Sequence, residues 1–150
     1  MKLKLVAVGT KHDPRLKDKL AEFEKRLPYS IDWRLLPYSK AEDDTARRLE
    51  SAQINGQLQP QDFVVLLDET GSQLTSDGLA EKLSSWRPSG RQLVFVIGGA
   101  YGVDQALKER ADFIWSLSKL VFPHQLVRLL LVEQLYRANA IAGGHPYHHR

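Results

Sequence analysis

The sequence predicts an α/β protein with a mostly parallel sheet flanked by helices on both faces. Short apolar stretches typical of strands alternate along all 150 residues with longer stretches of helical periodicity. The stretches 62–69 and 91–102, the second of which runs into three glycines, are apolar enough for strands buried on both faces. No repeat or linker divides the chain, so we expect a single domain over residues 1–150.

The first half of the chain contains two strands, each followed by a helix. Residues 2–8 alternate between Lys and apolar residues and then become fully apolar, which predicts an opening strand. Residues 14–27 begin with Pro and carry Leu and Phe on one helical face, so we expect a helix that Pro28 ends. A second strand is predicted at 31–37, and the charged stretch 41–56 predicts a helix that a glycine stops.

The second half repeats this order three times. Strands are expected at 62–69, 91–102 and 113–118. Each is followed by a helical pattern, at 76–86, 103–111 and 124–141. In open α/β sheets, ligands bind outside the carboxyl ends of the strands, so the loops there are the places to look for a site. If the central strands are neighbours, one pocket is formed by the loops 66–71, 96–102 and 116–124.

The composition limits the functions open to this chain. It contains no cysteine, which excludes disulfides and thiolate zinc sites. The first ten residues are too short and too alternating for a signal peptide or membrane span, so we expect a cytoplasmic protein without a membrane partner. Residues 1–30 hold eight Lys and Arg against four Asp and Glu, and residues 115–150 hold four against one. This asymmetry suits a polyanionic partner where the two ends of the chain meet.

The glycine-rich stretch 98–102 does not match a nucleotide-binding fingerprint. A dinucleotide motif would need glycine at position 97, which is Ile97, and no phosphate-binding loop with a Gly-Lys-Ser/Thr ending occurs. Both absences weaken nicotinamide and nucleoside-triphosphate chemistry. The glycines either form a tight turn or let the edge of a flat ligand, such as adenine, lie on the bare backbone at Gly98 and Gly99.

The segment after the last predicted strand is unusual because a second apolar stretch, residues 120–122, precedes Pro123 and the final helix. Its polar atoms are mostly backbone atoms. A ligand wrapped by this loop would therefore be recognised by main-chain N–H and C=O groups. The alternative is a hydrophobic loop that plugs into the core.

The chain ends in HPYHHR, and four of its five histidines lie within the last 27 residues. Histidine exchanges a proton near neutral pH, and a terminal Arg can contact phosphate. A metal site would need carboxylate or cysteine partners beside these histidines, and the tail offers none, so we expect no metal. The helix predicted at 124–141 is apolar around more than one face, which predicts burial against a second subunit.

The motifs FVIGGAYG, LSKLVFPHQLVR, EQLYRA and HPYHHR, with the opening MKLKLVAVGT, resemble the RlmH family along the whole chain. These are SPOUT-class methyltransferases that methylate N3 of a pseudouridine in 23S ribosomal RNA. The resemblance implies a C-terminal trefoil knot at 117–123, a homodimer and S-adenosylmethionine as the methyl donor. It assigns donor binding to Leu67, Gly98, Leu117, Ser118, Lys119, Leu120, Val121 and Phe122. One departure is that His149 takes the place of the family's final basic residue and Arg150 follows.

The acceptor side needs a base and cationic groups, and four residues are candidates. Arg137 is expected to hold a phosphate or a carbonyl whose negative charge rises on deprotonation. Tyr147 is expected to stack on or hydrogen-bond the target base, and His148 or His124 to take its proton. The sequence leaves open which residue is the base, whether His124 merely caps its helix, and whether the tail acts in its own chain or in the partner.

Two other functions fit parts of the sequence. A small-molecule nucleotide enzyme fits the α/β pattern but lacks the fingerprint glycine and the ribose-binding acid. A ribosome-associated binding module without catalysis fits the charge, but the complete tail argues against it. Because so short a chain has no separate RNA-binding domain, we expect the substrate to be 23S rRNA within the assembled ribosome.

Overall fold

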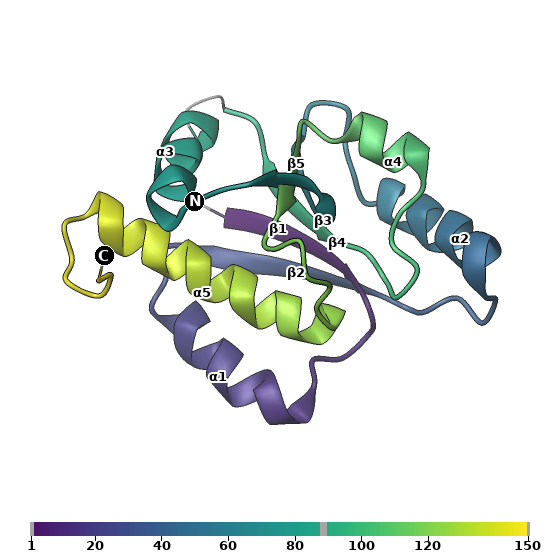
Figure 1. Cartoon of the computed structure of the whole chain (residues 1–150), viewed down its shortest axis with the longest axis horizontal. Coiled ribbons are helices and arrows are strands. Elements are labelled where there is room, and N and C mark those ends of the chain that lie inside the picture. The colour runs from purple at the N-terminus through teal and green to yellow at the C-terminus, as the bar shows by residue number, and fades with distance from the viewer. Residues whose placement is uncertain (1, 88–89, 150) are drawn as a thin grey trace.

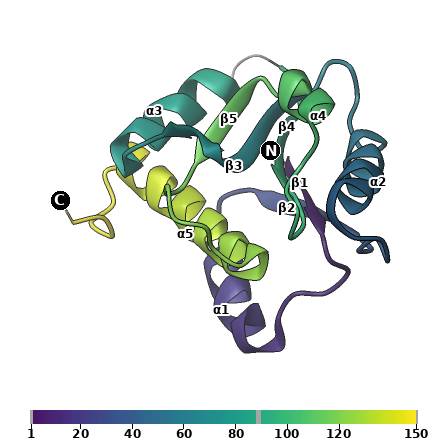
Figure 2. The ribbon, with the colours of Figure 1, turned by 45° about the vertical axis from the view of Figure 1, so that its right-hand side comes forward.

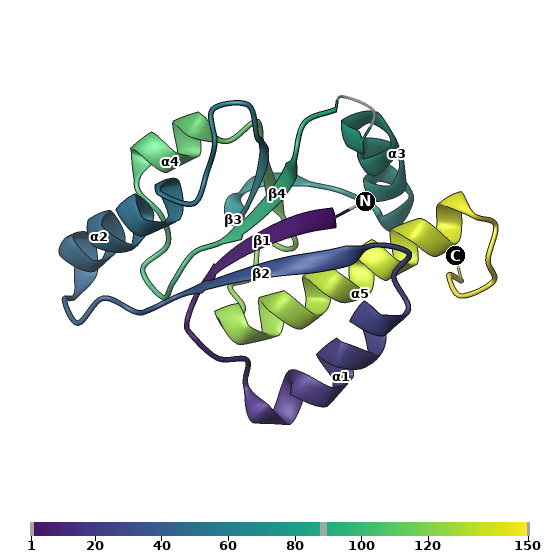
Figure 3. The same ribbon diagram turned by 180° about the vertical axis from the view of Figure 1, so that it is seen from behind.

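Five parallel strands form one sheet in the order β2-β1-β4-β3-β5 in the computed structural model, which describes residues 2–87 and 90–149. Figure 1 shows the sheet and Figure 3, seen from behind, shows β2 along its open edge. The strands are β1 (Lys2–Val8), β2 (Ser30–Leu36), β3 (Phe63–Gln73), β4 (Leu93–Ile97) and β5 (Phe113–Ser116). The predicted α/β class and mostly parallel sheet are confirmed.

The helices cover both faces of this sheet, as Figure 2 shows in a view turned by 45° from Figure 1. They are α1 (Pro14–Lys25), α2 (Asp43–Asn55), α3 (Ser76–Trp86), α4 (Gln105–Arg110) and α5 (His124–Ala142). Helices α1, α3 and α5 pack on one face with one core cluster, and α2 and α4 pack on the other face with a second. Every predicted element is present, and the largest differences are that β4 ends at Ile97 instead of 102, because the glycine-rich stretch forms a loop, and that β3 continues to Gln73 instead of stopping at 69.

The two core clusters follow from the alternation of side chains along the central strands. In β1, Leu3 and Leu5 belong to the cluster under α1, α3 and α5, whereas Val6 and Val8 belong to the cluster under α2 and α4. Strand β4 is buried along its whole length, as the continuous apolar pattern predicts. Within the described residues, no helix combines the length and apolar character needed to cross a bilayer.

Strand β3 leaves the regular ladder just where the predicted pocket begins. Its pairing with β5 is interrupted between Leu67 and Ser72, and both of these residues pair with Trp115. Gly71 lies within this irregular stretch, and a Cβ atom there would lie 2.4 Å from the carbonyl oxygen of Ile114. A residue without a side chain is therefore required for the close approach of the two strands, and the intervening residues are pushed out of the sheet.

Candidate active site

A cavity of about 790 Å³ lies at the carboxyl ends of β3, β4 and β5, where the sequence predicts one pocket. The three expected loops all contribute to its wall. Seven of the eight residues assigned to the donor line it: Leu67, Gly98, Leu117, Ser118, Leu120, Val121 and Phe122. The eighth, Lys119, is exposed and is not part of this wall.

The loop 117–123 is held in an irregular path by its own serines. The Ser116 hydroxyl donates to the carbonyl of Ser118 at 2.8 Å, and the Ser118 hydroxyl accepts from the backbone N–H of Leu120 at 3.0 Å. Leu120 and Val121 are 71% and 77% exposed, so the alternative of a loop plugged into the core is wrong for these two side chains. Two adjacent apolar side chains are therefore exposed at the wall of the cavity.

The glycines of the loop 96–102 allow neighbouring residues inside the protein to pack closely against the backbone. A Cβ on Gly98 would lie 2.8 Å from Val103, and one on Gly99 would lie 2.5 Å from Glu50 Oε1. Helix α2 also holds this loop from behind, because Arg47 Nε donates to the carbonyl of Tyr101 at 2.8 Å. These contacts favour the turn-and-packing interpretation of the glycines and fix the floor of the cavity.

Two carboxylates that the sequence analysis missed form part of the cavity wall. Asp68 and Glu69 line it immediately after the buried part of β3. Asp68 forms an ion pair with Lys108 at 3.7 Å, whereas Glu69 is exposed to solvent. The signal was available in the sequence, since two acidic residues follow an apolar strand at its carboxyl end. Apolar walls with nearby carboxylates suit an organic ligand that carries a positive charge.

His124 lines the cavity at the first residue of α5. Its Nε2 shares a short hydrogen bond with the Tyr38 hydroxyl, and α5 has no side-chain cap, so the capping alternative is wrong. Burial lowers the pKa of His124, the positive charge of Arg128 lowers it further, and the negative charge of Glu50 opposes both. The imidazole is therefore neutral at pH 7.

Arg128 is buried and stabilises the structure next to the site. It is 1% exposed, and its Nη2 donates to the carbonyls of Val8 at 3.0 Å and Gly9 at 2.9 Å. Its Nη1 donates to the carbonyl of Lys11 at 3.0 Å. Arg128 thereby joins the start of α5 to the turn after β1, while Arg137 lies at the other end of the helix.

The tail residues form a cluster around Glu133, a residue that the sequence analysis did not select. Arg137 Nε and Nη2 donate to Glu133 Oε1 at 3.0 and 2.6 Å, and the Tyr147 hydroxyl donates to the same oxygen at 3.1 Å. Arg137 Nη1 lies 3.0 Å from His148 Nδ1, and the guanidinium lies 4.8 Å from the centre of the Tyr147 ring. The i, i+4 spacing of Glu133 and Arg137 was the available signal.

The environment of Tyr147 bears on its chemical role. Partial burial raises the pKa of its phenol, and the hydrogen bond and negative charge of Glu133 raise that pKa further. Tyr147 is therefore protonated at neutral pH and acts as a hydrogen-bond donor. Its ring packs against Tyr136 at 4.7 Å between centroids, which anchors the tail to α5.

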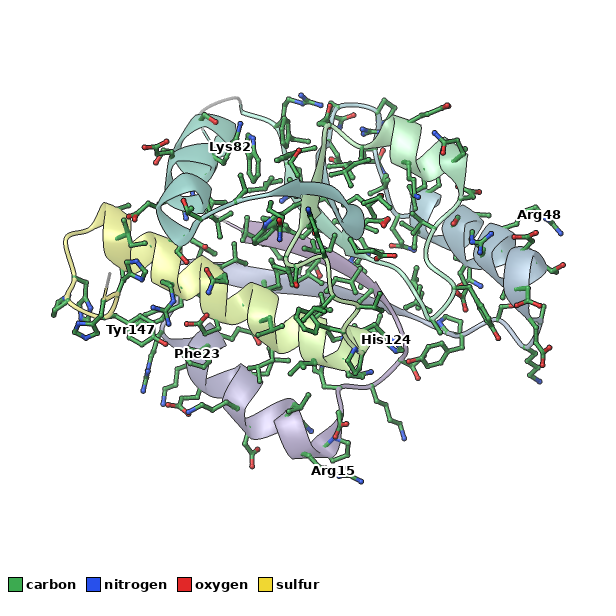
Figure 4. The ribbon with its side chains drawn as sticks, viewed as in Figure 1. Arg15, Phe23, Arg48, Lys82, His124 and Tyr147 are labelled. Carbon is green, nitrogen blue, oxygen red and sulfur yellow. The ribbon has the colours of Figure 1, made fainter. Side chains whose placement is uncertain are left out.

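The four predicted acceptor-side residues do not meet within one chain. His124 and Arg137 are thirteen positions apart on α5. At 1.5 Å per residue, they are separated by about 20 Å along the helix axis. Figure 4 shows His124 and Tyr147 at opposite ends of α5. Arg137, Tyr147 and His148 cluster together, and His124 stays with the cavity.

Comparison with known proteins places this cavity and tail in a family. The family described as "Predicted SPOUT methyltransferase" matches residues 1–148. The chain is 39% identical over 153 residues to ribosomal RNA large subunit methyltransferase H of Methylobacillus flagellatus, covering 99% of both proteins. It is 42% identical over 154 residues to the enzyme of the same name from Ralstonia nicotianae, again covering 99% of both.

A solved structure supports the fold independently. A probable methylase family protein from Haemophilus influenzae Rd KW20 superposes with a TM-score of 0.56 at 12% sequence identity, covering 99% of this chain and 70% of that one. At this identity the match speaks for the fold alone. The full-length sequence matches show that the chain belongs to the SPOUT methyltransferases, in the family of ribosomal RNA large subunit methyltransferase H.

Proposed function

We propose that the protein transfers the methyl group of S-adenosylmethionine to N3 of a pseudouridine in 23S rRNA of the assembled ribosome, and hence acts in the cytoplasm. The observation on which this proposal rests is sequence identity. The chain is about 40% identical, over 99% of its length, to relatives named ribosomal RNA large subunit methyltransferase H. The cavity at the strand ends supports it, because its size and lining fit the donor.

The fit to the donor can be argued from the wall of the cavity. A volume of about 790 Å³ is ample for an adenosine joined to an amino acid. Leu67, Leu117 and Phe122 offer apolar contact to the adenine, and the irregular backbone of residues 117–122 offers polar groups to its ring edge. When bound, the donor supplies an electrophilic methyl carbon on a sulfonium, and the displacement needs no metal ion.

The protein's own residues position the acceptor and take its proton. The ring N3–H must lose its proton as the nitrogen electron pair forms the new C–N bond, while the C–S electrons return to sulfur. Negative charge then rises on the neighbouring carbonyl oxygens of the base. Arg137 is the cation of the tail cluster suited to hold such an oxygen. Tyr147 is protonated, so it donates a hydrogen bond or stacks and does not serve as the base.

We assign the base to His148. Its Nδ1 lies 3.0 Å from Arg137 Nη1, so this nitrogen is the acceptor atom of the imidazole. When Arg137 turns to the carbonyl of the target base, Nδ1 becomes available for the N3 proton. His124 remains at the donor cavity, where its contact with Tyr38 keeps one ring nitrogen engaged.

The separation of about 20 Å along α5 favours a site built from two chains. For the tail to reach a methyl group in the cavity, the tail of one protomer must lie at the cavity of its partner. The exposed Leu120 and Val121 beside the cavity offer an apolar surface for that partner. We therefore propose a homodimer with two composite sites, each with the donor side from one chain and the acceptor side from the other.

The proposed function is tested with labelled S-adenosylmethionine and ribosomes from a strain that lacks this gene. We expect label in one pseudouridine of 23S rRNA, with intact ribosomes preferred over deproteinised RNA. Ribosomes from the parent strain, already methylated, are the control and should take up little label. Donor binding without label in either sample would refute the substrate, and ribosome binding without transfer would indicate a binding module.

A substitution at His148 tests the assignment of the base. We expect His148→Gln to lower kcat about 10²- to 10⁴-fold, because glutamine cannot accept the N3 proton. The matched variant His124→Gln should lower it far less and act mainly on the KM for the donor. Steady-state assays on ribosomes at varied donor concentration give kcat and the KM for the donor. If His124→Gln shows the larger loss in kcat, the assignment of the base must be reversed.

A further inference from the structure

The structure contains a buried carboxylate that the proposed chemistry does not use. Glu50 lies on α2 and is 4% exposed. Its Oε2 accepts the backbone N–H of Ser39 at 2.9 Å, whereas its Oε1 is buried without a hydrogen-bond partner in the described part of the chain. Burying a carboxylate with an unsatisfied oxygen costs free energy, so such a group calls for a functional explanation.

Glu50 lies directly behind the wall of the donor cavity. Its Oε1 faces Gly99, since a Cβ on that glycine would be only 2.5 Å away, and Gly99 lines the cavity. The negative charge of Glu50 also acts on His124, another residue of the wall, where it favours the protonated imidazole. Two separate observations therefore indicate that the field of Glu50 reaches into the cavity.

Nearby cations do not neutralise this charge by direct contact. Within the described residues, 2–87 and 90–149, no ion pair joins Glu50 to Arg47 or Arg128. Arg47 instead contacts Asp44 and the carbonyl of Tyr101, and Arg128 contacts the carbonyls after β1. The other carboxylates at the cavity differ, because Asp68 is paired with Lys108 and Glu69 is exposed to water.

We propose that the buried carboxylate of Glu50 selects the positively charged sulfonium of the donor over the neutral thioether that remains after methyl transfer. This inference rests on the proposed function, since it takes S-adenosylmethionine as the ligand of the cavity. An unbalanced negative charge behind an apolar wall favours a cation in the cavity and gives no such advantage to S-adenosylhomocysteine. Glu50 is thus a specificity-determining residue that promotes exchange of spent product for fresh donor.

The size of the effect follows from Coulomb's law. For charges about 8 Å apart at an effective dielectric constant of about 20, the interaction corresponds to roughly 30-fold in affinity, and screening by cavity water lowers this. In Glu50→Gln, we therefore expect the Kd for S-adenosylmethionine to rise roughly 5- to 30-fold, while the Kd for S-adenosylhomocysteine changes less than about 2-fold. The glutamine keeps an acceptor for the Ser39 N–H.

The experiment is isothermal titration calorimetry of the full chain with both ligands, in wild type, Glu50→Gln and the control Glu42→Gln. Glu42 precedes α2 and is exposed, so its charge is screened by water and its loss should leave both Kd values unchanged. A third variant, Glu50→Asp, keeps the charge and should retain most of the preference for the donor. Thermal unfolding without ligand should show no loss of stability in Glu50→Gln, because the variant removes an unsatisfied buried charge.

Two results would overturn the proposal. Equal weakening of both ligands in Glu50→Gln would mean that Glu50 only shapes the wall at Gly99, and unchanged values would mean that its charge does not reach the ligand. Failure of the proposed function would look different, since wild type itself would then not bind S-adenosylmethionine.

Discussion

Arg137→Ala should lower kcat for methyl transfer to ribosomes about 10²- to 10³-fold, the loss typical of removing one donor to a developing negative charge. The reason is geometric. Arg137 is the residue that links Glu133, Tyr147 and His148, with contacts of 2.6 Å to Glu133 Oε1 and 3.0 Å to His148 Nδ1. Without it, the rising charge on the target carbonyl has no cation, and His148 loses the neighbour that orients it.

Donor binding provides the control for this variant. Arg137 lies about 20 Å along α5 from His124 at the cavity, so a direct effect on the donor of its own chain is not expected. The Kd for S-adenosylmethionine should stay within about 2-fold of wild type, by calorimetry. Arg137→Lys keeps the charge but loses the bidentate geometry, and we expect it to recover only part of the rate. Full activity of Arg137→Ala would remove the tail cluster from the mechanism.

Much of the fold was predictable because its elements depend on local patterns. The continuous apolar run of β4 and the alternation in β1 fix both the strands and the faces that they bury. Ends of elements were less exact: α2 begins at Asp43 instead of 41, and β5 ends at Ser116 instead of 118. These ends depend on tertiary contacts such as the Ser116 hydroxyl bond to Ser118, which periodicity does not contain.

The position of the cavity was predictable for a topological reason. Parallel strands place their carboxyl ends at one edge, so residues after three strands had to converge there. Lys119 is the exception, because periodicity cannot tell which side chain of an irregular loop faces inward. Asp68 and Glu69 were missed although they follow a buried strand, and Glu50 was hidden inside a charged helix whose register gives no sign of a buried carboxylate.

The cluster of tail residues was predictable only as a set of residues. The sequence places Arg137, Tyr147 and His148 near the end of the chain, and the structure brings them together around Glu133. The sequence alone cannot show that α5 holds this cluster far from His124, because that separation depends on a continuous helix of 19 residues. Whether the loop 117–123 is threaded as a trefoil knot stays a prediction from the resemblance.

Mixing two inactive variants tests the composite site most directly. Ala100 is exposed and lines the cavity, so Ala100→Trp should fill the donor side without disturbing the core. Arg137→Ala disables the tail. Each variant alone should be inactive, but after unfolding and refolding as an equal mixture, half of the dimers contain one chain of each kind. If the site is composite, the intact tail of one chain meets the intact cavity of the other in every mixed dimer, so one site works.

The measurement is methyl transfer to ribosomes by this refolded mixture, with each variant refolded alone as the control. If the cavity of one protomer and the tail of its partner form the active site, the mixture should recover about a quarter of wild-type activity, because random pairing leaves one site in four intact. If the tail acts in its own chain, every chain in the mixture carries a defect, and activity should stay at the level of the single variants. That second result would contradict the composite site.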